Sequence, residues 1–262
     1  MKTTNKKSKP EKSPDGTMSL SGHLKEMRNR IVVVLVVLLV GAVACFSFAP
    51  QIIEVLQGMG TQYEFQAIKP QESLLAQFSL SLLGAAVIGA PVIAYEVYAF
   101  MSPGLKKKEK TFFLLALIFG FIFFCIGVFF AYKVMLPFML RFLNEVSENM
   151  NVKQTISIQE YINFVLLIFL IFGIVFEMPV ISVLLTMMGI IRPEWMAKAR
   201  KVVIVLLFVL AALITPPDII SQIMVAFPMI FLYELSIWLS KFFYRFKKQK
   251  QEDEDEDEDE DD

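Results

Sequence analysis

One carboxylate lies inside an apolar run that is long enough to cross a membrane. The stretch IFLIFGIVFEMPVISVLL, residues 168–185, contains Glu177 two positions before Pro179. An ionised carboxylate at the middle of a bilayer costs about 2.5–3.5 kcal/mol, so proteins retain one mainly where it binds a proton, an ion or a polar helix. Glu177 is therefore the first candidate functional residue. The alternative is that it stabilises a helix kink before the proline.

The sequence lacks the other groups on which membrane enzymes and pumps depend. Its one histidine is His23, and the aspartates outside the acidic tail are Asp15 and Asp218. These residues exclude a serine–histidine pair, a multi-histidine metal site and an intramembrane pair of aspartates. No G-x-x-x-x-G-K-[ST] loop is present to bind nucleotide phosphates. We expect no catalytic residue, no bound metal, no cofactor and no nucleic-acid partner.

The composition predicts an all-α protein that crosses the membrane six times. Apolar residues make up 56% of the 262 residues, and the mean hydropathy is +0.58. A span needs about 20 apolar residues to cross a hydrocarbon core of about 30 Å. At 1.5 Å per residue the fifth apolar run extends only about 20 Å, so we expect a short hairpin of spans five and six. The six runs are 31–49, 74–100, 112–136, 161–188, 202–214 and 219–240.

Lys and Arg residues are distributed asymmetrically between the two ends of the spans. Of the 25 Lys and Arg residues, only Lys69, Lys133, Arg141 and Lys153 lie in the first, third and fifth connections. Because basic residues stay on the cytoplasmic side of short connections, both termini are predicted to be cytoplasmic. The formal net charge of −1 hides the basic excess, because the final stretch EDEDEDEDEDD carries 11 of the 26 acidic side chains.

The chain divides into three regions. Residues 1–18 are polar and basic and are predicted to be disordered, residues 19–240 form the membrane domain, and residues 241–262 form a basic and then acidic disordered tail. Within the domain, Pro91 and Pro228 should kink their helices. Kinked helices pack into a concave bundle more readily than into a straight one.

The outer connections are predicted to form a small cap. Amphipathic stretches begin at Pro50 and at Pro137, and the first of them breaks at Gly58. The sequence Ser157-Ile158-Gln159-Glu160 fits a capping box, which predicts that the fourth span begins there.

Five short motifs follow one another from residue 23 to about residue 240. They are HLKEMRNR (His23 to Arg30); Pro91, Ala99-Phe100, Pro103-Gly104-Leu105 and Glu109; Phe172-Gly173, Phe176-Glu177 and Pro179; Thr215-Pro216-Pro217-Asp218 and Ser221-Gln222; and Pro228 with Tyr233-Glu234. In this order they resemble the TatC family, the polytopic core of the twin-arginine protein translocase. Met27 stands where the family usually has Leu and Tyr98 where Trp is common, and the acidic tail matches no family motif.

The resemblance implies a glove-like, six-span protein in a bacterial-type cytoplasmic (inner) membrane. It implies a non-enzymatic receptor that recognises folded precursors by an Arg-Arg signal peptide, within a multimeric, lipid-embedded complex driven by the proton gradient. The implied partners are single-span TatA/TatB-type subunits. The implied signal-peptide residues are Glu26, Arg28, Ile31, Phe100 and Glu109, and the implied docking points for partner helices are Glu177, Thr215 and Gln222.

Structural roles are the alternatives for the signal-peptide residues. Glu26 could pair with Arg30 one helical turn later, and Glu109 lies within the charged run KKKEK, which is typical of a solvated loop. Phe100 could offer a cation–π contact or simply anchor the helix at the membrane interface. We expect Arg28 to organise this surface rather than to bind a cation.

Two functions other than protein translocation are compatible with parts of the sequence. A proton-coupled carrier of a small solute could use Glu177, whereas an intramembrane enzyme lacks a nucleophile and base. For Thr215 and Gln222 the alternative is that they cap and solvate the last hairpin.

Overall fold

The structure is a computed structural model of the 262-residue chain. It describes residues 20–104, 107–149, 155–215 and 218–260; within these ranges the side chains of 20–23, 107–109, 248 and 250–260 are outside the description. The N-terminal segment 1–18, which is predicted to be disordered, lies outside the described residues.

Helices make up most of the described chain, which confirms the predicted all-α class. The long helices are α1 (Leu20–Phe46), α3 (Glu72–Met101), α4 (Lys107–Phe130), α6 (Ile158–Phe176), α7 (Met178–Met187), α8 (Pro193–Ile214) and α9 (Ile219–Glu260). The connections carry α2 (Ala49–Gln57), α5 (Leu136–Asn149), β1 (Glu64–Gln66) and β2 (Thr155–Ser157). A 3-10 turn at Ser102–Gly104 follows α3, and a π-helical turn at Ala131–Met135 joins α4 to α5.

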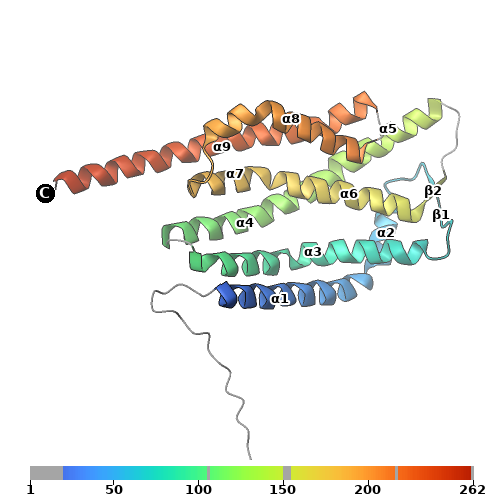
Figure 1. Cartoon of the computed structure of the whole chain (residues 1–262). Coiled ribbons are helices and arrows are strands. Elements are labelled where there is room, and N and C mark those ends of the chain that lie inside the picture. Colours follow the sequence, from blue (N-terminus) through green and yellow to red (C-terminus); the bar gives the residue numbers. More distant parts are fainter. Residues whose placement is uncertain (1–19, 105–106, 150–154, 216–217, 261–262) are drawn as a thin grey trace, which may run out of the picture.

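The long helices lie side by side in a row (Figure 1). Helix α1 packs on α3, α4 packs on α6 and α7, and α9 packs on α7 and α8. The starts of α1, α4 and α8 and the ends of α3 and α7 share one end of the row, which we call the α1 end. Strands β1 and β2, helix α2 and the end of α5 lie at the opposite end, which we call the cap end.

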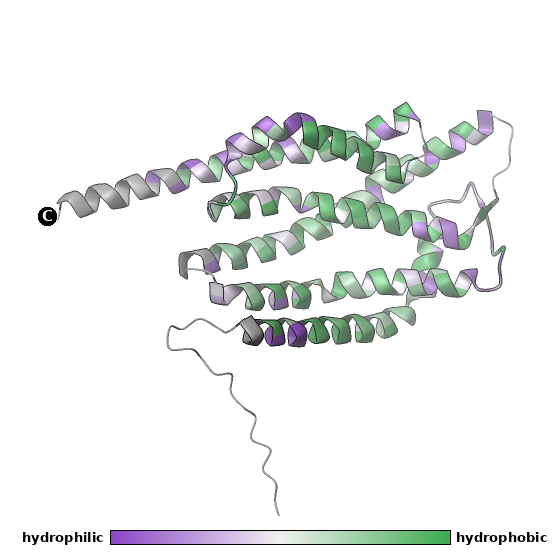
Figure 2. Ribbon diagram, viewed as in Figure 1, coloured by the Kyte–Doolittle hydropathy of each residue, from purple (hydrophilic) through white to green (hydrophobic). Residues whose placement is uncertain are grey.

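The outside of the bundle is apolar, as contact with lipid requires. Figure 2 shows hydrophobic residues along the long helices and hydrophilic residues toward their ends. Val43 on α1, for example, is 68% exposed. Within the described ranges, five helices are long and apolar enough to cross a membrane.

Helix α8 is shorter and more polar, in line with the short hairpin expected from the sequence. Its first half carries Lys198, Arg200 and Lys201. Figure 1 shows that the end of α8 and the start of α9 stop short of the cap end, so α8 covers only part of the bundle's length.

The irregularity predicted before Pro179 is confirmed. Glu177 ends α6 and precedes α7, so the fourth span is interrupted at this residue. Pro179 is in the first turn of α7, where its missing N–H leaves no helix hydrogen bond unmade. By contrast, α3 and α9 continue through Pro91 and Pro228.

The cap is held by hydrogen bonds between distant segments. Ser157 caps α6 as predicted, because its Oγ accepts from the backbone N–H of Glu160 at 3.4 Å. The Ser157 hydroxyl also donates to Oε2 of the buried Glu72 at 2.8 Å.

Two buried tyrosines tie other segments of the cap together. Tyr63 donates to the carbonyl of Leu140 at 2.7 Å, and Tyr161 donates to the carbonyl of Leu56 at 2.5 Å. Strands β1 and β2 pair in parallel between these contacts.

The last helix extends past the end of the membrane domain. The backbone of α9 is helical from Ile219 to Glu260, beyond residue 240, the predicted end of that domain. Extending a helix that a membrane span has already nucleated gains one hydrogen bond for each residue added, which favours this continuation. Lys247 fixes the first part of the extension, because its Nζ donates to the carbonyl of Met187 at the end of α7, at 3.0 Å.

Candidate functional site

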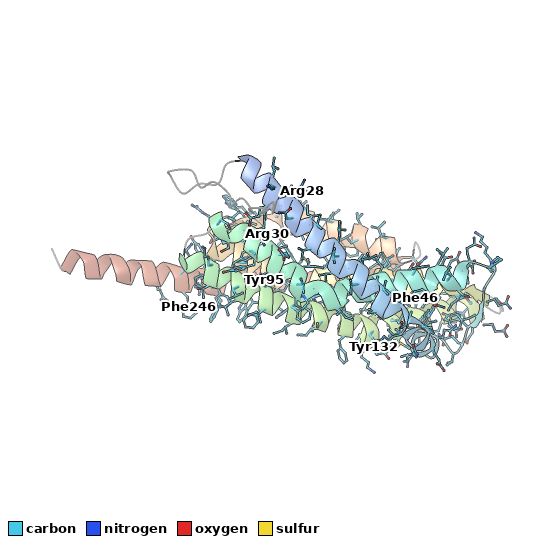
Figure 3. All side chains as sticks on the ribbon, turned by 90° about the horizontal axis from the view of Figure 1, so that it is seen from below. Arg28, Arg30, Phe46, Tyr95, Tyr132 and Phe246 are labelled. Carbon is cyan, nitrogen blue, oxygen red and sulfur yellow. The ribbon has the colours of Figure 1, made fainter. Side chains whose placement is uncertain are left out.

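Three charged side chains meet at the α1 end, where α1 crosses α3. Nε and Nη2 of Arg30 donate to Oε1 of Glu26 at 3.1 and 2.5 Å, and Nη1 donates to Oε2 of Glu96 at 2.8 Å. Glu26 lies one turn before Arg30 on α1, and Glu96 belongs to α3. We call Glu26, Arg30 and Glu96 the carboxylate cluster. In Figure 3, Arg28 and Arg30 are labelled near the same end of α1.

Small residues on the two helices set the register that brings Arg30 to Glu96. A Cβ atom on Gly41 would lie 3.1 Å from Cβ of Ala85, and one on Gly89 would lie 3.2 Å from Cγ1 of Val37. These contacts place two antiparallel helices in close approach, with residue 37 of α1 opposite residue 89 of α3. Seven residues further toward the α1 end, the same register reaches Arg30 on α1 and Glu96 on α3.

The carboxylate cluster is partly withdrawn from solvent and carries a net negative charge. The side chains of Arg30, Glu26 and Glu96 are 24%, 23% and 14% exposed. Both hydrogen bonds that Glu26 accepts from Arg30 fall on Oε1. Among the described residues, its Oε2 is buried and has no hydrogen-bond partner. A buried carboxylate oxygen without a donor loses the hydrogen bonds that it would make to water, which favours the approach of a new donor.

Of the predicted signal-peptide residues, the structure brings Glu26 into this cluster. The Glu26–Arg30 pair, considered above as the structural alternative for Glu26, is present. Of the remaining residues, Arg28 is exposed on α1, Ile31 is 49% exposed, Phe100 is half-buried near the end of α3, and Glu109 lies in the first turn of α4 with its side chain outside the described part.

Sequence reasoning missed Glu96. It is an acidic residue in a long apolar run, as Glu177 is, and that signal was available in the sequence. Its partner could not be identified in the same way, because Arg30 is 66 positions away and the pairing depends on the register of α1 against α3.

Glu177 occupies the break in the fourth span and faces α4. A Cβ atom on Gly120 would lie 2.9 Å from Oε2 of Glu177, so the glycine provides the space that the carboxyl group fills. Next to this contact, an apolar cavity of about 340 Å³ lies between α4, α7 and α9. Its lining includes Phe119, Phe123, Pro179, Val180, Leu239 and Phe243.

Thr215 and Gln222 both make hydrogen bonds within the last hairpin. Oγ1 of the buried Thr215 donates to the carbonyl of Ala211 at 3.1 Å, at the end of α8. Nε2 of Gln222 on α9 donates to the carbonyl of Phe208 on α8 at 3.0 Å. These contacts agree with the hairpin-stabilising alternative for the two residues.

Acidic, histidine and cysteine side chains do not come together as a metal site in the described part of the chain, where no group of three or more is found. Cys45 and Cys125 are both free thiols. The chemistry available at the carboxylate cluster is therefore the binding of cations by charge and hydrogen bonds.

Comparison with known proteins agrees with the motifs and the fold. The family model of the Sec-independent protein translocase protein TatC matches residues 22–228. TatCy of Bacillus subtilis (strain 168) is 38% identical over 230 residues, which cover 87% of this chain and 91% of that protein. TatC of Aquifex aeolicus (strain VF5) is 35% identical over 237 residues, which cover 88% of this chain and 98% of that protein. A crystal structure described as the twin-arginine translocase receptor TatC superposes with a TM-score of 0.75 at 35% identity and covers 84% of this chain and 99% of that one. The chain therefore belongs to the TatC family, a component of the Sec-independent protein translocase.

Proposed function

We propose that this TatC-family protein binds twin-arginine signal peptides at the carboxylate cluster and the adjoining surface. The observation that carries the proposal is a partly buried cluster with one more carboxylate than guanidinium, built from Glu26, Arg30 and Glu96. Arginine binds carboxylates through planar, charge-assisted hydrogen bonds, so a preformed acidic cluster suits an Arg-Arg ligand. The similar crystal structure is described as a receptor, which supports the same assignment.

The proposed site faces the cytoplasm. In the sequence, 21 of the 25 Lys and Arg residues belong to the two terminal segments and to the second and fourth connections, and such an excess marks the cytoplasmic side of a membrane protein. A precursor that has folded in the cytoplasm would therefore meet Glu26 and Glu109 before it crosses the membrane. The lysines of the run KKKEK repel a cationic ligand, so Glu109 can take part only if it is turned away from them.

Site-specific crosslinking tests the binding site. An Arg-Arg signal peptide carrying a photoreactive residue beside the arginine pair should label the wild-type protein, and Glu26→Ala or Glu109→Ala should reduce the labelling severalfold. Glu194→Ala is a matched control, because Glu194 is an exposed carboxylate at the start of α8, at the same end of the bundle. Unchanged labelling of both test variants would refute the site assignment.

We also propose that single-span TatA/TatB-type subunits dock on the face that contains Glu177. The carboxyl group has no hydrogen-bond partner among the described residues and lies beside the apolar cavity between α4, α7 and α9. A polar side chain on a partner helix could satisfy it, and such interhelical bonds are worth about 0.6–2 kcal/mol. In this proposal Thr215 and Gln222 serve the partners by fixing the shape of the neighbouring hairpin, and the proton gradient drives transport by the assembled complex.

Reconstitution separates this assembly from a small-solute carrier. If the protein is a translocase subunit, Glu177→Ala should weaken co-purification of the single-span partners, and Glu177→Gln, which keeps a hydrogen-bonding side chain, should weaken it less. Proton-driven uptake of a small solute by the purified chain alone in liposomes, with no partner present, would instead support a carrier.

A further inference from the structure

We propose that Glu96 is a positioning residue for the signal-peptide site: it offsets the charge of Arg30, so that Glu26 keeps the negative charge that attracts a ligand arginine. This inference rests on the proposed function, because it concerns the same cluster. It assigns a role to a residue that neither the motifs nor the composition indicated.

The charges of the cluster carry the first step. Glu26 paired with Arg30 alone would form a neutral ion pair with little attraction for a second guanidinium. Glu96 contributes a second carboxylate, whose Oε2 accepts from Nη1 of Arg30 at 2.8 Å. The three side chains together then carry a charge of about −1, which matches one arginine of the ligand. Because they are at most 24% exposed, this charge is screened less than it would be on an open surface.

The hydrogen-bond geometry carries the second step. Nε and Nη2 of Arg30 both donate to Oε1 of Glu26 while Nη1 donates to Glu96, and Oε2 of Glu26 has no partner among the described residues. A carboxylate that pairs with guanidinium in the bidentate arrangement uses both oxygens. The bond from Nη1 to Glu96 helps to fix the guanidinium in the orientation in which Nε and Nη2 both engage Oε1 of Glu26. Rotation of the Glu26 carboxyl about its terminal bond would then present the unpaired oxygen to a ligand.

The surrounding charges make the offset necessary. Lys25 and Arg28 are exposed on the same turns of α1 and raise the local positive potential. Without Glu96, the described charges on this stretch of α1 would be three cations against Glu26 alone. These described charges sum to +1 with Glu96 and to +2 without it, so an Arg-Arg ligand would then meet stronger repulsion at close range.

Four variants of the full-length protein, in detergent or lipid nanodiscs, test the proposal. Binding of a fluorescent signal peptide with an Arg-Arg pair is titrated for the wild type, Glu96→Gln, Arg30→Gln, the double variant Arg30→Gln/Glu96→Gln, and the matched control Glu194→Gln. A peptide with Gln-Gln in place of the pair measures the binding that does not depend on charge. Thermal unfolding of each variant monitors the fold.

The cluster charge predicts the order of the affinities. Glu96→Gln leaves a neutral cluster and should weaken Arg-Arg binding about tenfold or more. The double variant restores a charge of −1 and should bind within about threefold of the wild type. Arg30→Gln leaves two unpaired carboxylates and should bind more tightly, with a steeper dependence on salt. Glu194→Gln should bind the Arg-Arg peptide with the wild-type affinity. The affinity for the Gln-Gln peptide should be the same in all variants.

Each other outcome overturns the inference. If Glu96→Gln binds as the wild type does, Glu96 has no role in binding. If the double variant is folded but stays as weak as Glu96→Gln, Glu96 supports the fold or contacts the ligand directly instead of offsetting Arg30. Should Glu96→Gln fail to fold, weaker binding by Arg30→Gln would still refute the charge argument. The proposed function fails separately, if the wild type does not distinguish Arg-Arg from Gln-Gln or if Glu26→Ala binds normally.

Discussion

The carboxyl group of Glu177 fits against Gly120, where a Cβ atom would lie 2.9 Å from Oε2 and 3.4 Å from Oε1. Glu177 interrupts the fourth span, and Gly120 lies in the middle of α4. The missing side chain on α4 therefore makes room for the carboxylate of Glu177. The two residues should behave as a coupled pair.

Gly120→Ala is expected to displace the Glu177 carboxyl group and to lower the free energy of unfolding. Overpacking of this kind typically costs about 1–3 kcal/mol. Because the clash is with a side chain, the double variant Gly120→Ala/Glu177→Ala should lose less stability than the sum of the two single variants. Thermal unfolding in detergent measures all three. If the effects are additive, the two residues are not coupled as the geometry indicates.

Substitution of Gly127, where α4 crosses α6, should be tolerated less well than substitution of Gly120, which contacts Glu177. A Cβ atom on Gly127 would lie 2.6 Å from the backbone carbonyl oxygen of Phe172, which cannot rotate away as a side chain can. Gly127→Ala should therefore separate the two helices and cost at least as much stability as Gly120→Ala. Gly104→Ala is the control for thermal unfolding, because nothing lies within 4 Å of a Cβ atom there. Equal melting temperatures for Gly127→Ala and Gly104→Ala would contradict the close approach of α4 and α6 at Gly127.

The sequence predicted the parts of the fold that depend on local pattern. Long apolar runs located the spans, the capping residues placed the start of α6 at Ser157, and Pro179 marked the irregularity of the fourth span. The fifth run, 202–214, was too short for a full span, which predicted the short α8–α9 hairpin. Each of these features is determined by residues within about 20 positions of one another, so a single sequence can reveal them.

Features that depend on distant residues were not predicted. Strands β1 and β2 have three residues each and lie about 90 positions apart, so they carry no recognisable strand pattern. The pairing of Arg30 with Glu96 depends on how Gly41 and Gly89 let α1 approach α3.

The α8–α9 hairpin should depend on Gln222. Its amide donates to the carbonyl of Phe208 across the hairpin, and interhelical bonds in membranes are worth about 0.6–2 kcal/mol. Gln222→Leu keeps much of the volume but removes the donor, so it should speed amide hydrogen exchange in residues 205–214. Ile223→Leu is the control, because Ile223 is 48% exposed. Equal exchange in both variants would show that the bond does not stabilise the hairpin.

The cap should loosen at alkaline pH through Tyr63. Its hydroxyl must be protonated to donate to the carbonyl of Leu140, and burial raises the pKa of Tyr63 above its usual value of about 10. A pKa that is higher in the folded state contributes stability that is fully present below pH 10 and is lost as the pH rises through the folded-state value. Tyr63→Phe lacks this bond at every pH and should be less stable by about 0.5–1.5 kcal/mol near neutrality.

Local exchange measurements can isolate this effect from the rest of the protein. Hydrogen exchange of residues 56–66 and 136–149 should be faster in Tyr63→Phe than in the wild type at pH 7, after correction for the intrinsic rate. The difference should shrink above pH 10, because the wild type then loses the same bond. Tyr95→Phe serves as the control, since Tyr95 is 61% exposed on α3 and its phenol is not needed by the cap. A difference that stays constant over the whole alkaline range in which the wild type remains folded would mean that the Tyr63 proton does not hold the cap to α5.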